Sequence, residues 1–120
     1  MKDSWHNNLI GKRLNERSDW HDFGLCDIDG ASLKVYLSNK RFIIYESKYR
    51  MENLSQSQKR ILDTLDEAID WKKFDELSGV FIIRIVDIDE ELEWFDLQGK
   101  LIRTTTLDEL YEIFSAKDKV

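Results

Sequence analysis

The segment "GVFIIRIVDIDEELEWFDLQGKLIRTT", Gly79 to Thr105, decides the fold expected for the second half of the chain. It begins with the longest apolar run in the sequence. "VFIIRIVDI" is apolar on both of its faces, which is typical of a central strand covered on both sides of a sheet. "EELEWFDL" and "KLIRTT" follow as shorter strands joined at Gln98-Gly99. The segment therefore predicts a three-stranded antiparallel meander.

The first half predicts a second meander. "FGLCDI" runs into Asp29-Gly30, a dipeptide that favours a type I′ hairpin turn. "SLKVYL" alternates between apolar and other residues, as in a strand with one buried face. A short turn then leads into "RFIIYES", which is apolar on both faces.

Three helices are expected around these strands. An apolar stripe predicts a first helix over residues 4–16, and a second stripe on an acidic background predicts a helix over residues 56–72. Thr106 begins the last helix, where "TLDE" fits a capping box in which Thr106 and Glu109 each bond the backbone amide of the other. The expected buried stripe of this helix consists of Leu107, Leu110, Tyr111 and Phe114.

The element order is thus αβββαβββα, which indicates an α+β fold with a mainly antiparallel six-stranded sheet packed by helices. The strands form either one sheet or two meanders. With 120 residues, we expect a single domain over residues 1–120. Residues 23–72 and 80–115 share the order βββα, and "DID" at 27–29 overlays "DID" at 87–89. Either an internal duplication or chance matching explains this similarity between the two halves.

Charge is divided unevenly along the chain. Residues 1–60 carry 11 Lys and Arg against 8 Asp and Glu, a net charge of +3, whereas residues 61–120 carry 7 against 16, a net charge of −9. An acidic surface repels nucleic acid and attracts basic proteins. The second half is therefore not expected to bind nucleic acid directly.

The remaining composition predicts a cytoplasmic protein. No apolar stretch is long enough to cross a bilayer, and the N-terminus has no apolar signal region, so no membrane partner is expected. Cys26 is the single cysteine, which excludes an intramolecular disulfide and a zinc site with several cysteines. The oligomeric state is left open.

One pattern is typical of an enzyme. Asp29 is followed by "FIIYESK", an apolar strand that ends in Glu46 and Lys48. This arrangement resembles the core of the PD-(D/E)xK nucleases. The resemblance implies a metal-dependent nuclease in which Asp29, Glu46 and Lys48 are catalytic and Glu16 is a further ligand. No Pro precedes Asp29, however, and an acidic protein is poorly suited to bind a phosphodiester.

No other metal or cofactor site is predicted. Counted from Asp87, "DIDEEL" has Leu92 at the sixth position of a calcium loop, where Gly is required for the turn. "SDWHDF", residues 18–23, contains His21, but the chain has only two histidines and neither lies in a metal-binding spacing. We expect neither a metal nor a cofactor.

The favoured function is protein binding without catalysis. We expect a small acidic inhibitor of a basic protein, of the immunity, antitoxin or nuclease-inhibitor type, with a phage or mobile-element accessory protein as a further alternative. The carboxylates of residues 87–96 are explained either by an ordinary solvated hairpin or by a surface for a basic partner. Trp94 and Phe95 lie on opposite faces of one strand, so one of them is a candidate exposed anchor among carboxylates. The predicted partner surface consists of Asp87, Asp89, Glu90, Glu91, Glu93, Trp94 and Asp96, flanked by Asp63, Glu67 and Asp70 of the second helix.

Overall fold

The computed structural model describes Ile10 and residues 24–28, 33–38, 40–49 and 52–117. The helix expected at residues 4–16 and the Asp29-Gly30 turn lie outside these residues, except for Ile10, which is helical and buried. The described elements are β1 (Gly24–Ile28), β2 (Leu33–Ser38), β3 (Arg41–Tyr49), α3 (Gln56–Ala68), the 3₁₀ turn η2 (Trp71–Lys73), β4 (Gly79–Asp87), β5 (Glu91–Phe95), β6 (Leu101–Thr105) and α4 (Leu107–Ser115).

The described strands form one sheet in the order β1-β2-β3-β4-β5-β6, so they do not separate into two meanders. All neighbours are antiparallel except β3 and β4, which are parallel. Parallel neighbours need a crossover connection, and α3 provides it. The predicted α+β class, with its mainly antiparallel sheet, is confirmed.

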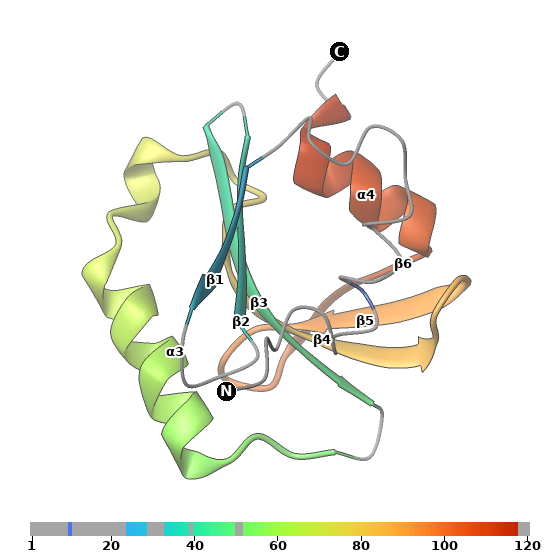
Figure 1. The fold of residues 1–120 in the computed structure, drawn as a ribbon, viewed down its shortest axis with the longest axis horizontal. Coiled ribbons are helices and arrows are strands. Elements are labelled where there is room, and N and C mark those ends of the chain that lie inside the picture. Colours follow the sequence, from blue (N-terminus) through green and yellow to red (C-terminus); the bar gives the residue numbers. More distant parts are fainter. Residues whose placement is uncertain (1–9, 11–23, 29–32, 39, 50–51, 118–120) are drawn as a thin grey trace.

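Helices α3 and α4 cover opposite faces of the sheet (Figure 1). Alternate residues of β4 show how: Phe81 and Ile83 pack in the cluster beneath α4, while Val80 and Ile82 pack in the cluster beneath α3. Because successive strand side chains point to opposite faces, an unbroken apolar run is what a doubly covered strand requires. The prediction that "VFIIRIVDI" forms a central strand is therefore confirmed.

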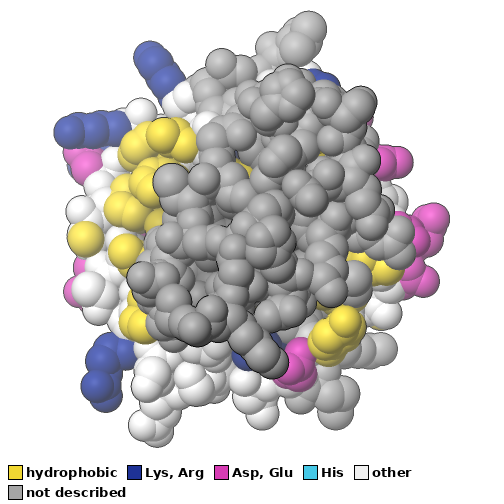
Figure 2. Space-filling view, viewed as in Figure 1, with side chains coloured by type: hydrophobic (Ala, Val, Ile, Leu, Met, Phe, Trp, Pro, Cys, Tyr) yellow, Lys and Arg dark blue, Asp and Glu magenta, His cyan; other side chains and the backbone are white. Residues whose placement is uncertain are grey.

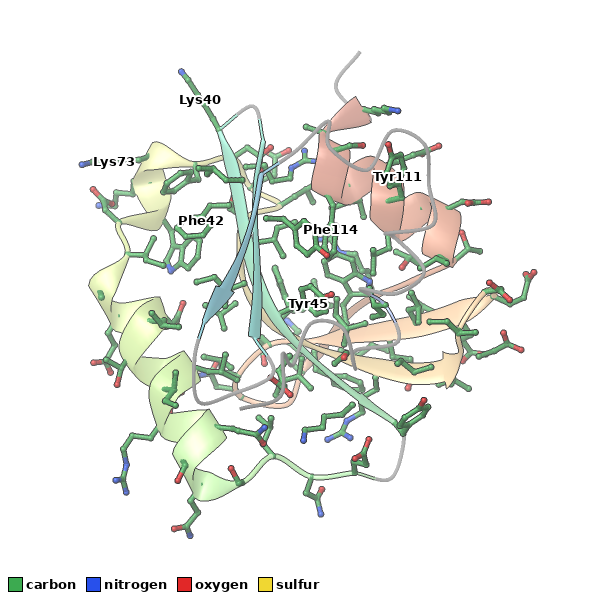
Figure 3. The ribbon with its side chains drawn as sticks, viewed as in Figure 1. Lys40, Phe42, Tyr45, Lys73, Tyr111 and Phe114 are labelled. Carbon is green, nitrogen blue, oxygen red and sulfur yellow. The ribbon has the colours of Figure 1, made fainter. Side chains whose placement is uncertain are left out.

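The larger core lies between the sheet and α4. Tyr45 and Phe114 point toward each other there, with ring centroids 5.3 Å apart (Figure 3). The residues predicted for the buried stripe of α4 are all buried, and the capping box joins Thr106 and Glu109 in both directions. Local sequence thus determines both the start of α4 and the face that it buries.

The second helix is shorter than predicted. α3 ends at Ala68, four residues before the expected end, and Ile69 is already extended. The indole N–H of Trp71 donates to the backbone oxygen of Asp66 at 3.1 Å and to its carboxylate at 2.9 Å. Asp70 begins η2 by accepting a hydrogen bond from the amide of Lys72. These contacts replace the last turn that the apolar periodicity predicted.

Candidate acidic partner surface

The turn between β4 and β5 presents carboxylates at one end of the molecule. Asp87 Oδ1 accepts hydrogen bonds from the amides of Asp89 at 3.1 Å and Glu90 at 3.3 Å, so Asp87 shapes the turn. Its neighbours Asp89, Glu90 and Glu91 are exposed, and so is Asp87 itself. Four of the predicted partner residues therefore do lie together.

The first turn of α4 lies beside this hairpin. The amide of Leu107 donates a 3.0 Å hydrogen bond to the backbone oxygen of Asp89. The buried stripe of α4 turns Asp108, Glu109 and Glu112 outward, and all three are exposed. We call the combined set the acidic ridge: Asp87, Asp89, Glu90, Glu91, Asp108, Glu109 and Glu112.

The three α4 carboxylates were missed in the sequence. The capping box and the apolar stripe predict that they face solvent, and Asp108 and Glu109 also have an ordinary structural explanation. Acidic residues near a helix N-terminus interact favourably with the helix dipole, and Glu109 accepts the amide of Thr106 at 2.9 Å. Only the contact between Leu107 and Asp89 shows that they adjoin the hairpin.

Trp94 is not an exposed anchor, which corrects the sequence prediction. Its side chain is 0% exposed, lies 5.4 Å from the ring of Phe81, and donates its indole N–H to the Thr105 hydroxyl at 2.9 Å. Phe95 points to the other face and packs against the cluster beneath α3. The inference of an exposed aromatic assumed a sheet covered on one side only, whereas helices cover both sides.

Two further carboxylates of the hairpin region lie apart from the ridge. Glu93 is half-buried and pairs in register with Arg84, whose guanidinium lies 5.9 Å from the ring centroid of Phe95. Asp96 is at the other end of β5, where its carboxylate accepts the amides of Gln98 and Lys100, both at 2.9 Å. Their positions favour structural roles.

The predicted flanking acids of α3 also lie elsewhere. α3 packs on the sheet face opposite α4, so Asp63 and Glu67 do not adjoin the β4–β5 turn (Figure 1). Asp70 caps η2 on that same side. The helix period correctly indicated an acidic outer face, but the crossover places it across the sheet from the ridge.

Acidic side chains of the described residues gather at the hairpin end of the molecule. In Figure 2, acidic side chains gather at the right-hand edge, where the β4–β5 hairpin projects in Figure 1. Lys40 and Lys73 are exposed at the opposite side (Figure 3). That side also carries the exposed carboxylates Glu67 of α3 and Asp70 beside η2, so it is mixed in charge, whereas the hairpin end is acidic.

The structure describes only two of the four residues on which the nuclease alternative depends. Glu46 and Lys48 share the α3 face of β3, but Glu46 is 1% exposed, and its carboxylate lies 3.5 Å from the side-chain amide of Gln58. Asp29 and Glu16 lie outside the described residues. Within the described part of the chain, no three His, Cys, Asp or Glu side chains are grouped closely enough to hold a metal ion.

Comparisons with known proteins return no relative: no protein-family model, no curated protein and no solved structure matches this chain. Among the helices described, none has the length and apolar character needed to cross a membrane.

Proposed function

We propose that this chain is a binding protein that holds, and thereby inhibits, a basic protein partner through the acidic ridge. The observation that supports this proposal is the placement of seven exposed carboxylates on the β4–β5 turn and on α4, whose first residue contacts that turn. Carboxylates on one surface add their potentials, which accelerates association with a positively charged partner.

The cations described near α4 do not lie in the middle of this surface. Arg103 lies with its guanidinium 5.4 Å from the ring centroid of Trp94, and Lys117 lies 4.9 Å from the ring centroid of Tyr111. Arg103 is half-buried, and Lys117 follows the C-terminal end of α4. The described cations nearest α4 thus lie against aromatic rings of the core and of α4.

The partner expected from this chemistry is a protein with a cluster of Lys and Arg, such as a toxin or an enzyme that acts on nucleic acids. Binding of the ridge to a basic cleft would exclude a polyanionic substrate from that cleft. Exposed charges contribute chiefly to the association rate, so the ridge needs further contacts to slow dissociation.

The test begins with capture of salt-released proteins from the cells that produce the chain, followed by kinetics with the purified basic partner. We expect Glu90→Lys with Glu91→Lys to slow association about tenfold or more at low salt and to weaken its salt dependence. The matched control, Asp63→Lys with Glu67→Lys, makes the same charge change on α3 and should have a smaller effect. Equal association rates for the two double variants would contradict the proposal.

A further inference from the structure

The outer edge of β6 is the second unusual surface of the molecule. In the part of the chain that the structure describes, β6 ends the strand order, with β5 as its neighbour. An edge strand presents backbone N–H and C=O groups that another chain can pair with. Proteins commonly protect such edges with charged residues, yet the first two residues of β6 are Leu101 and Ile102.

Both of these apolar side chains reach solvent. Leu101 is 47% exposed and Ile102 is 38% exposed. β5 and β6 pair Trp94 with Arg103 and Phe95 with Leu101, so Ile102 is an extra residue without an opposite partner on β5. Such a bulge bends the strand and interrupts its ladder. It leaves two consecutive apolar residues beside a short regular stretch, 103–105.

The chemistry changes along β6. Its apolar end is at Leu101, and its other end, Thr105, leads into the first turn of α4 and the acidic ridge. Five extended residues span about 16 Å, so one short peptide can reach both ends. A segment laid along this edge would meet apolar side chains first and carboxylates at the far end.

We propose that β6 accepts an extended segment of the basic partner as an added strand, with apolar residues beside Leu101 and Ile102 and Lys or Arg beside the ridge. This proposal rests on the proposed function and names how the partner is held. Backbone pairing along 103–105 supplies few hydrogen bonds, because the bulge shortens the ladder. The apolar contacts and the charges therefore supply the remaining affinity and the direction of the segment.

Synthetic peptides test this proposal without the natural partner. The probe is a peptide in which Val and Thr alternate and several Lys follow. The first control is the same peptide with N-methylated backbone amides, which keeps the side chains and the charge but cannot form a strand ladder. The second control is oligolysine, which tests the ridge alone. Calorimetry measures affinity, and amide chemical shifts show whether β6 is the contacted strand.

We expect the Val–Thr–Lys peptide to shift the amides of β6 and to bind at least about tenfold more tightly than its N-methylated form. Leu101→Ser with Ile102→Ser should weaken binding about tenfold through lost apolar contact. Both substitutions keep the charge. Leu37→Ser on β2 is the matched control, because Leu37 is 53% exposed and four strands away, and it should leave the affinity unchanged.

Each contrary result has its own meaning. Equal binding of the N-methylated peptide, or an equal loss with Leu37→Ser, would overturn strand addition at β6. If the β6 amides shift with protein concentration when no peptide is present, the β6 edge pairs with a second copy of the chain. That result would also overturn the proposed strand addition. Failure of oligolysine to bind, together with no effect of ridge reversal on peptide affinity, would instead overturn the acidic-ridge proposal.

Discussion

The indole N–H of Trp94 donates a 2.9 Å hydrogen bond to the Thr105 hydroxyl, and both side chains are buried beneath α4. This bond links β5 to β6 and satisfies the one polar atom of an otherwise apolar ring. A buried Trp requires such a partner, since an unpaired donor in the core costs free energy. Trp94 therefore belongs to the core, and the partner that we propose would meet carboxylates and the β6 edge instead.

Thr105→Val should lower the free energy of unfolding by about 1–3 kcal/mol, because Val keeps the shape of Thr but cannot accept the indole N–H. Urea denaturation followed by far-ultraviolet circular dichroism measures the loss. Thr104→Val is the control: Thr104 is exposed on the same strand, and its substitution should change stability by no more than about 0.5 kcal/mol. Similar losses at both positions would show that the Trp94 bond is not the cause.

Asp75→Ala should destabilise the fold by about 3–5 kcal/mol, because it removes the carboxylate facing a buried guanidinium. Arg41 is 1% exposed, and its Nε lies 2.8 Å from Asp75 Oδ2 while its Nη1 donates to the backbone oxygen of Ile113 at 2.7 Å. The ion pair thereby ties β3 to the loop before β4 and to the end of α4. Chemical denaturation of the variant measures the effect.

The neighbouring exposed carboxylate provides the comparison for that ion pair. Glu76→Ala should change stability by about 0.5 kcal/mol or less. A loss at Asp75 no larger than the loss at Glu76 would contradict the assigned role.

Thr106→Ala should cost about 1 kcal/mol of stability, because the Thr106 hydroxyl accepts the Glu109 amide at 3.1 Å at the start of α4. Thermal and urea unfolding both measure this loss. Thr106→Ser retains the hydroxyl and should remain close to the original stability. If Ser were as damaging as Ala, packing of the Thr methyl group rather than capping would explain the effect.

Gly99→Ala should cost about 1–2 kcal/mol through backbone strain. Gly99 has φ +87°, a region that L-residues with a Cβ avoid, while no heavy atom beyond its two chain neighbours lies within 4 Å of the position that a Cβ would take. Asn tolerates positive φ better than Ala, so Gly99→Asn should cost less. Equal stability of the Ala variant and the original protein, measured by urea unfolding, would show that the turn relaxes without cost.

Local sequence was sufficient for much of the fold. The apolar run of β4 predicted a strand covered twice because strand side chains alternate between faces, and Thr106 with Glu109 predicted the start of α4 because a capping box needs only neighbouring residues. The end of α3 was less predictable. It depends on the indole of Trp71, which bonds Asp66 and ends the helix before its apolar periodicity does.

The candidate site was predicted less well, since a surface depends on contacts between distant segments. The β4–β5 turn was correctly expected to expose carboxylates, but its neighbour proved to be α4 rather than α3. The crossover from β3 to β4 places α3 on the face of the sheet opposite α4. The sequence around Asp63 and Glu67 does not indicate which face of the sheet the helix covers.

The amino-acid sequence by itself determined the α+β class, the order of the strands along the chain, the doubly covered β4 and the acidic character of the second half. These features follow from alternation, helical periodicity and composition, which act over a few residues. Only the tertiary structure decided that Trp94 is buried, that α4 completes the acidic ridge, and that Leu101 and Ile102 lie on an open edge of the described sheet. These three features depend on which segments cover each face and edge of the sheet. Contacts between residues far apart in the sequence determine that coverage.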